Sequence, residues 1–455
     1  MSTIEQFGYR QELKRTLGFA DLMIYGLIFM VPIAPFGIFG YVFSTSHGMV
    51  ALAYVIGLLA MAFTALSYAQ MARAFPMAGS VYTYAGRGIA APVGFMAGWA
   101  ILLDYVLVPS LLYLIASGAM HSFVPAIPVW AWLVMFVLLN TGINYLGIQM
   151  TARITRVMLV AELAVLAIFL VAGVVALAQG KGQAGAFSPI FESSSFTWSV
   201  MFAAASVAVL SFLGFDGIST LAEENREDAR RLGRSMLAAL GVAAVLFVVQ
   251  TWVAALLTPG SDKLIAEGDL TGNAFYDTAA FAGGQWLAVL TAVATAIAWG
   301  FANSLVAQAA TSRLLFAMAR DRQLPRFLAK VDPKRQVPVN ATFAVAGISL
   351  AVGLFMSTRE QGAGELTSLV NFGAMTAFLL LHVAVVVHYA IRQGSRDYWA
   401  HLVAPVIGFG ILVAVVINQN VAAQWVGGIW LALGLVVLGL SYLSGRGPVL
   451  PKEVM

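Results

Sequence analysis

The chain has no cysteine among its 455 residues, and only 10% of its residues are charged. Without cysteine it can form no disulfide and offers no thiolate ligand to a metal. Soluble globular proteins average about 25% charged residues, so the composition excludes a soluble domain. The five His residues are scattered and show no metal-like pairing with Asp or Glu. We therefore expect neither an enzyme nor a bound cofactor.

Hydrophobic residues make up 60% of the chain and gather in long segments. A membrane span needs roughly 20 apolar residues, so this length accommodates about twelve spans with short connections. All should be helices, because backbone exposed to lipid must satisfy its own hydrogen bonds. We predict an all-α polytopic membrane protein with spans near residues 18–43, 49–72, 91–118, 126–147, 153–178, 200–224, 233–258, 281–318, 339–357, 364–391, 400–419 and 423–444.

Positive charge is distributed unevenly between the gaps that separate these segments. All of the 25 Lys and Arg residues except Lys181, Lys263 and Arg359 lie at the two ends of the chain or in every second gap. Basic loops stay on the side of the membrane from which the chain is inserted. We therefore expect an integral protein of the cytoplasmic (plasma) membrane with both termini in the cytoplasm. The net charge of +4 then reflects these loops and not nucleic-acid binding.

Two of the predicted spans are interrupted. Pro32 and Pro35 lie in the middle of the first, where each removes a helical hydrogen bond. Gly214 and Gly217 flank Asp216 in the sixth and lower the helix propensity there. Spans that are five apart cross in opposite directions, so the breaks fall at matching places of two inverted five-helix repeats. Paired breaks of this kind point to a transporter site.

Four further segments carry recognisable motifs: Phe75–Tyr84, Gly98–Tyr105 with its Gly-Trp and Asp-Tyr pairs, Gly214–Glu224, and Ser312–Asp321 followed by Pro325 and Pro338. As a set they resemble the amino acid–polyamine–organocation (APC) superfamily of permeases, and within it the putrescine-importer branch. The resemblance implies a LeuT-type fold and secondary transport by alternating access. It divides the chain into a cytoplasmic tail (1–17), a first inverted repeat of helices one to five (18–178), a second of helices six to ten (200–391), helices eleven and twelve (400–444) and a second cytoplasmic tail (445–455).

The break in the first span favours an amine over a carboxylate as the substrate group. Many permeases of the superfamily have a Gly-x-Gly turn here that holds the substrate carboxylate, whereas this chain has prolines and so fewer N–H donors. The putrescine importers that it resembles typically have Asp where this chain has Gly37. One partner for a second ammonium group is therefore missing. A diamine, a monoamine and a neutral amino compound all remain compatible with the sequence.

Acidic residues within the spans are the main site candidates, because ionisable groups are expensive inside a membrane. Asp104 lies roughly 20 Å into the third span, where it would bind an ammonium group, carry a proton or bond to a neighbouring helix. Asp216 would either contact the amine or cap the half-helix that follows the break. Tyr105 would either cover a bound cation or pack in the core.

Further substrate-binding candidates are residues of the two broken segments, together with polar or aromatic residues on spans eight and ten. They are Ile33, Ala34, Phe36, Gly37, Phe212, Phe215, Trp299, Asn303 and Asn371. The aromatic residues would form apolar walls and a gate. Aromatic side chains also pack in any membrane core, so this alternative stays open for each of them.

Glu162 is the candidate for coupling transport to a proton. It lies in the fifth span, roughly 15 Å from the cytoplasmic end. In some proton-coupled relatives of the superfamily a Lys occupies the matching place, and an acid there could carry the proton instead. Alternatively Glu162 forms an ion pair with Arg156 or with another cation on the cytoplasmic side, although a separation of six residues from Arg156 is not a favoured helical spacing. Sodium coupling also stays open, through backbone carbonyls and hydroxyls such as Ser304.

Charged residues at the cytoplasmic ends of the spans could form an inner gate or simply be solvated. The candidates are Arg153, Glu223, Glu224 and Arg313.

We predict a proton-coupled importer of a small organic amine or amino acid, with a putrescine-like polyamine favoured. Its partners would be the substrate, a proton or sodium ion, and membrane lipid, but no nucleic acid. The alternatives are an exchanger of an amine for its decarboxylation partner and a sodium-coupled neutral amino acid permease. A channel is disfavoured, because the spans carry isolated polar residues and no continuous polar face.

Overall fold

The computed structural model describes residues 7–8, 10–269, 272–359, 362–419, 421–443 and 447–448, and within these ranges it has helices and loops but no β-strand. The α-helices are α1 (Phe19–Met30), α2 (Pro35–Thr45), α3 (Val50–Ala74), α4 (Ser80–Gly88), α5 (Ala91–Phe123), α6 (Val129–Leu146), α7 (Ile148–Ala178), α8 (Trp198–Ala208), α9 (Gly217–Thr220), α10 (Ala229–Leu257), α11 (Ser261–Glu267), α12 (Ala274–Gly283), α13 (Gln285–Ile297), α14 (Ser304–Arg320), α15 (Val339–Met356), α16 (Gly362–Val385), α17 (Ala404–Ile417) and α18 (Val421–Leu443). Shorter 3-10 or π-helical turns are η2 (Val209–Phe212), η3 (Ala222–Glu224), η4 (Ala298–Asn303), η5 (Arg326–Ala329), η6 (Val386–Arg392) and η7 (Trp399–Val403).

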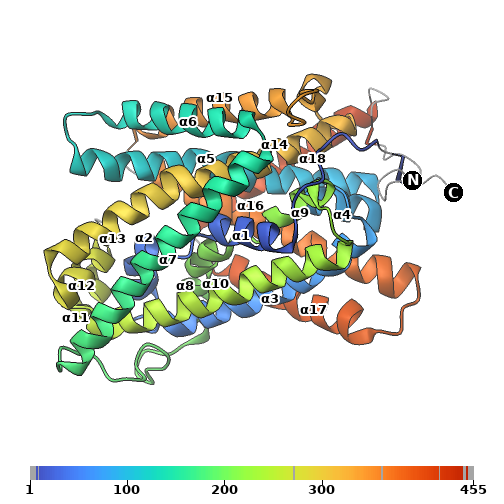
Figure 1. The fold of residues 1–455 in the computed structure, drawn as a ribbon. Helices are drawn as coiled ribbons and strands as arrows, with labels where there is room; N and C mark the ends of the chain where they lie inside the picture. The colour runs from blue at the N-terminus through green and yellow to red at the C-terminus, as the bar shows by residue number, and fades with distance from the viewer. Residues whose placement is uncertain are drawn as a thin grey trace.

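Within the described ranges, eleven helical segments are long and apolar enough to cross a membrane, and the bent pair α1 and α2 forms a twelfth. The predicted all-α membrane protein with about twelve spans is therefore confirmed. Figure 1 shows most of the long helices running in the same general direction, as a membrane-crossing bundle requires. The division into repeats and terminal tails stays a prediction. Most of the residues assigned to the tail 445–455, and residues 1–6 and 9 of the first tail, lie outside the described ranges.

The first span is broken between Met30 and Pro35. The axes of α1 and α2 differ by 53° across this break. Pro32 lies within the break and has no backbone N–H to continue the ladder of helical hydrogen bonds. Pro35 then occupies the first turn of α2, where its fixed φ suits the start of a new helix. The two prolines thus end one half-helix and begin the next, as the sequence predicted.

The sixth span is broken at Gly214. Its first half, α8, tightens into the 3-10 turn η2, and the chain resumes as the short helix α9 at Gly217. Gly214 has a φ of +118°, a conformation that L side chains rarely adopt. A Cβ at this position would lie 2.8 Å from the backbone carbonyl carbon of Phe29. Glycine therefore permits the turn and lets the sixth span approach the end of α1 closely.

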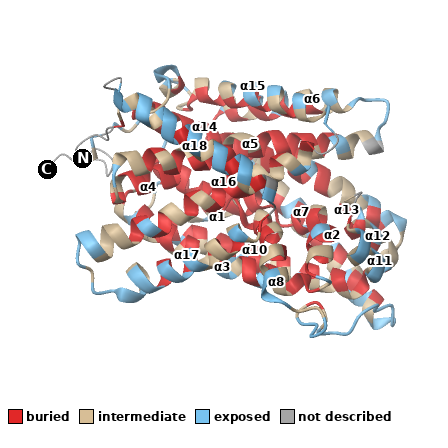
Figure 2. Cartoon of the chain, turned by 180° about the vertical axis from the view of Figure 1, so that it is seen from behind, coloured by how far each residue is buried: buried red, intermediate tan, exposed pale blue. Residues whose placement is uncertain are grey.

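Buried residues concentrate on the central helices, including α1, α5 and α16, whereas outer helices such as α15 and α17 carry many exposed positions (Figure 2). Only 11% of the most apolar part of α18 is buried within the protein. Its exposed residues are nevertheless apolar, for example Trp425 and Leu433. Such a surface suits contact with lipid, where the bilayer covers apolar side chains.

Candidate functional site

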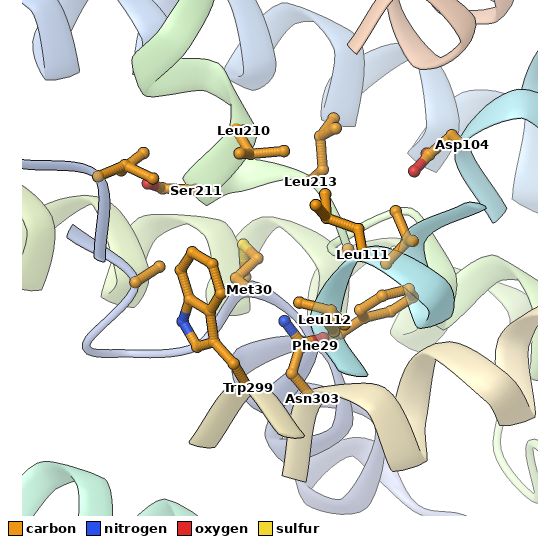
Figure 3. A pocket seen from close by; sticks show the side chains of 14 residues that line it. Phe29, Met30, Asp104, Leu111, Leu112, Leu210, Ser211, Leu213, Trp299 and Asn303 are labelled. Carbon is orange, nitrogen blue, oxygen red and sulfur yellow. The ribbon is translucent and has the colours of Figure 1, made fainter. Parts of the chain in front are cut away.

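A cavity of about 50 Å³ lies between the two broken spans, α5 and η4. This volume holds a few water-sized groups. It is lined by Phe29, Met30, Ala34, Ile38, Asp104, Val108, Leu111, Leu112, Leu210, Ser211, Leu213, Gly214, Trp299 and Asn303. The walls are mostly apolar, and Figure 3 shows the few polar side chains placed around them. Four residues predicted from the sequence line it: Ala34, Asp104, Trp299 and Asn303.

Asp104 contributes a carboxylate to this cavity. Its residue is 4% exposed, and its side chain makes no hydrogen bond or ion pair with any residue in the described ranges. In Figure 3 the carboxylate lies on the opposite side of the cavity from Trp299. A buried carboxylate is costly to leave unpaired. The geometry therefore leaves Asp104 available to a cation or a proton.

Asp216 is also buried, but its oxygens are occupied. The Tyr105 hydroxyl donates to Oδ2 at 2.6 Å, and the Gly214 N–H donates to Oδ1 at 3.3 Å. Its side chain makes no capping hydrogen bond to α9. The capping alternative is therefore wrong for α9: the carboxylate accepts from Gly214, two residues earlier in the break. Asp216 thus ties the break of the sixth span to α5 through Tyr105.

Trp299 and Asn303 reach the cavity from η4, a π-helical stretch in the eighth span. Asn140 of α6 supports this stretch, because its Nδ2 donates to the Gly300 carbonyl at 3.2 Å and to the Ser304 hydroxyl at 2.8 Å. The Trp299 Nε1 and the Asn303 Oδ1 are buried without a hydrogen-bond partner in the described structure. π-Helical stretches frequently occur at functional sites. This wall of the cavity therefore carries one unpaired hydrogen-bond donor, Trp299 Nε1, and one unpaired acceptor, Asn303 Oδ1.

Comparison with known proteins identifies the family. A family model described as amino acid permease matches residues 21–440. The chain belongs to this family, within the APC superfamily. It is 32% identical over 447 residues to the low-affinity putrescine importer PlaP of Escherichia coli (strain K12), which covers 97% of this chain and 96% of PlaP. It is 28% identical to the branched-chain amino acid permease BcaP of Bacillus subtilis (strain 168), with 94% and 93% covered. A methylthioribose transporter of the same organism is 25% identical, with 96% and 95% covered.

The family assignment confirms the predicted resemblance and the prediction that the chain is not an enzyme. The permease is an integral membrane protein and a transporter of the amino acid and amine class.

Most of the other predicted substrate-binding residues lie near the cavity without lining it. Phe36 stacks on Phe275 with 4.0 Å between ring centroids. Gly37 lies beneath Trp299, since a Cβ there would be 2.9 Å from Trp299 Cζ2. Ile33 is fully buried. These residues therefore pack around the break in the first span and do not line the cavity.

Two further candidates, Phe212 and Phe215, belong to the sixth span, and a third, Asn371, contacts it. Phe212 contacts the rings of Tyr54 and Phe247. Phe215 contacts Tyr68 and Phe378. Asn371 of α16 donates to the Ser206 carbonyl at 3.4 Å. In this conformation all three hold the sixth span in place.

Most of the apolar lining was not predicted from the sequence, although part of it was recoverable. Val108, Leu111 and Leu112 follow Asp104 at intervals of four, seven and eight residues, which places them on one face of α5. Once Asp104 was selected, helical periodicity alone would have selected this face. Met30 and Ser211 sit at the edges of the breaks, and no pattern in their local sequence sets them apart.

Glu162 lies on the buried stripe of α7, between Leu159 and Leu166. It is 5% exposed, and neither carboxylate oxygen has a partner among the described residues. The alternative pairing with Arg156 is wrong, because Arg156 forms an ion pair with Asp21 of α1 instead. Glu162 does not line the cavity. The permease thus holds two unpaired buried acids in separate places.

The Ser304 hydroxyl donates to the Gly300 carbonyl at 2.7 Å and accepts from Asn140. These bonds hold the π-helical stretch against α6. The role of Ser304 as a cation ligand stays a prediction.

Two ion pairs join the end of the sixth span to α14. Arg313 pairs with Glu224, and both side chains are buried. Arg320 pairs with Glu223 at 2.7 Å. Two of the four predicted gate acids and bases, Glu224 and Arg313, are thus in direct contact, and Glu223 lies beside them. Arg153 is exposed and forms no ion pair within the described ranges.

The N-terminal segment covers the same end of the bundle. The N–H groups of Thr16 and Leu17 both donate to the Glu224 carbonyl, and Arg226 donates back to the Leu17 carbonyl. Arg15 Nε donates to the Asn225 carbonyl at 2.9 Å. The chain before α1 is therefore bound directly to the residues that follow the sixth span.

Proposed function

We propose that this permease imports a small organic amine together with a proton, by alternating access. One observation carries the amine assignment: the Asp104 carboxylate faces the cavity and has no partner in the described structure. An ammonium group would supply the missing charge and hydrogen-bond donors. The apolar walls formed by Leu111, Leu112 and Leu213 suit the methylene chain of such a molecule.

The backbone at the first break supports an amine over a carboxylate. The N–H groups of Val31, Ala34 and Phe36 already donate to carbonyls of the same segment. Pro32 and Pro35 have no N–H to offer. In the second break, Gly214 donates to Asp216. A substrate carboxylate would therefore find few free donors here, whereas an ammonium group would find Asp104. The name of the relative PlaP, a putrescine importer, agrees with this choice.

We propose Glu162 as the proton carrier. A buried carboxylate without a partner is more readily held in the protonated form than one in an ion pair. The α7 helix that carries it packs against α1 and η4, which both border the cavity. Protonation of Glu162 could therefore be linked to movement of the broken span.

Alternating access would use the ion pairs at the end of the sixth span as the inner gate. Arg313 and Glu224 join α14 to the segment after α9, and opening toward this side would require the pair to separate. We place this end, and both termini, in the cytoplasm. The N-terminal segment lies there beside the basic gaps, since Arg87 donates to the Phe7 carbonyl. A LeuT-type arrangement of two inverted repeats is part of the same proposal.

A branched-chain amino acid is the second candidate substrate. The mostly apolar cavity favours it, and BcaP is named as a permease for such amino acids. In this case Asp104 would bind the α-amino group.

Uptake by purified protein in liposomes tests these assignments. We expect saturable uptake of labelled putrescine driven by an inward proton gradient, with no need for sodium or for substrate inside. Uptake of leucine without putrescine would overturn the amine assignment. A requirement for internal substrate would indicate exchange, and a requirement for sodium would indicate sodium coupling. Ion conductance without saturable uptake would indicate a channel.

A further inference from the structure

A second hollow lies away from the cavity, at the end of the bundle that carries the N-terminal segment. Its volume is about 520 Å³, within the range of small-molecule sites. It is lined by Gln70, Arg73, Asp228, Ala229, Arg230, Tyr389 and His401. These residues come from the end of α3, the start of α10, and the turns η6 and η7. In Figure 1 these helix ends lie on the same side as the N-terminus.

Two guanidinium groups in this hollow have no acidic partner. Arg73 and Arg230 are exposed, and neither forms an ion pair within the described ranges. Two neighbouring basic residues are directed elsewhere: Arg231 pairs with Glu227 at 2.8 Å, and Arg392 donates to the Ile89 carbonyl. Arg73 Nη1 donates only to the neutral Gln70 Oε1, at 3.5 Å. Both guanidinium groups line the hollow, where an anion with several acceptor oxygens could meet both.

The remaining polar residues are compatible with an anion. Asp228 is the one acid of the lining, and its Oδ1 accepts from the Arg231 N–H at 2.8 Å as the N-cap of α10. Its charge is thus directed to the start of a 29-residue helix, whose N-terminal end favours negative charge. His401 stacks on Tyr389 with 4.0 Å between ring centroids. The Tyr389 hydroxyl donates to the Gln70 carbonyl at 2.9 Å, which fixes this wall.

The surroundings of the hollow indicate that the anion belongs to a lipid. Trp399 and Tyr398 are 60% and 63% exposed at its edge, next to His401 in the chain. Exposed Trp and Tyr are typical of the level of the lipid headgroups. Val406, one turn further along α17, is also exposed and apolar. An acyl chain could lie along this face while its headgroup fills the hollow.

We propose that this hollow binds the phosphodiester headgroup of an anionic phospholipid, with Arg73 and Arg230 as the phosphate ligands. Basic pockets between membrane helices on the cytoplasmic side are suited to such headgroups. The bound lipid would join α3 to the start of α10 and to the turn before α17. These elements include the connection that follows the proposed inner gate.

The test uses the full-length permease, delipidated in detergent, and its thermal unfolding temperature. Phosphatidylglycerol should raise this temperature in a saturable way, because it binds the folded form. Phosphatidylcholine, whose headgroup has no net charge, should not. Inorganic phosphate should give little shift at the same concentration. A shift from phosphate equal to that from the lipid would assign the hollow to a free anion and overturn the lipid assignment.

Variants identify the site. The double variant R73Q/R230Q should bind phosphatidylglycerol about 25-fold more weakly, on the basis of about five-fold for each arginine near a membrane surface. The matched control R326Q/K330Q removes two exposed basic residues from another loop of the same basic set and should bind like the wild type. An equal lipid response in R73Q/R230Q and the control would rule the site out. If the double variant does not fold, the single variants R73Q and R230Q are measured, and the same criterion applies to each.

Discussion

The Tyr105 hydroxyl donates a 2.6 Å hydrogen bond to Oδ2 of Asp216, and so joins α5 to the break in the sixth span. Asp104 precedes Tyr105 on the same helix, yet its carboxylate faces the cavity and has no partner in the described structure. Two acids that look equivalent in the sequence therefore differ in their surroundings. One is held by the protein, and the other is available to a ligand. Substitutions at Asp104 and at Tyr105 should separate these roles.

Replacing Asp104 by Asn should strongly weaken amine binding while the protein still folds. The substitution removes the charge and keeps the size of the side chain. Loss of one partner of a buried, charged contact costs about 2–5 kcal/mol, so the apparent affinity for putrescine should fall by roughly 30-fold or more. Uptake and equilibrium binding in proteoliposomes measure this loss. Unchanged affinity in Asp104→Asn would remove the residue from the substrate site.

Replacing Tyr105 by Phe should act on stability before affinity. The change leaves Asp216 without its 2.6 Å donor but keeps the aromatic ring. An unsatisfied buried acceptor costs about 1–3 kcal/mol, so the unfolding temperature should fall. The affinity for putrescine should change much less than in Asp104→Asn. The opposite ranking of the two variants would show that Tyr105 contacts the substrate directly.

Replacing Glu162 by Gln should uncouple transport from the proton gradient. The amide cannot carry a proton through the cycle, so an inward proton gradient should no longer drive accumulation. Counterflow, in which labelled substrate exchanges against unlabelled, needs no net proton movement and should continue. The matched control is Glu192→Gln, which changes an exposed acid in a loop. Proton-driven accumulation in Glu162→Gln at the wild-type level would exclude this residue as the carrier.

The two breaks could be predicted from the sequence because their causes are local. Pro32 removes a donor and Gly214 allows a positive φ, wherever the rest of the chain lies. The acids within the spans were equally visible, because charge is scarce there. What each acid contacts was not predictable. The pairing of Arg156 with Asp21, for example, joins residues 135 positions apart.

Which side chains of the first span line the cavity was likewise not predictable from the sequence alone. Phe36 and Phe29 are both aromatic residues of the first span, yet Phe29 faces the cavity and Phe36 stacks on Phe275. The 53° bend between α1 and α2 determines which side chains point inward. A sequence pattern identifies the break, but the direction of the second half-helix depends on tertiary packing.

Introducing an acid at Gly37 tests whether a carboxylate at this position would bind the second ammonium group of a diamine. A Cβ at this position would lie 2.9 Å from the Trp299 ring, so Gly37→Asp alone should reduce transport by displacing that ring. Combining it with Trp299→Leu makes room for the carboxylate. The double variant should then prefer diamines over monoamines more strongly than Trp299→Leu does. Competition assays with putrescine and butylamine measure this selectivity. Identical selectivity profiles for the double variant and for Trp299→Leu would refute a role for position 37.

Breaking the ion pair between Arg313 and Glu224 should open the permease toward the proposed cytoplasmic side. Arg313→Gln leaves Glu224 buried without its partner, at a cost of about 3–5 kcal/mol to the closed form. The chain has no cysteine, so Ser211→Cys in the cavity lining serves as a single reporter. A membrane-impermeant maleimide applied from the cytoplasmic side should label this cysteine at least about ten-fold faster in the Arg313→Gln background, because the open form gains population. Arg153→Gln, which removes an exposed arginine outside the pair, is the matched control and should leave the rate unchanged. Equal labelling rates in the Arg313→Gln and Arg153→Gln backgrounds would mean that the ion pair does not close this route to the cavity.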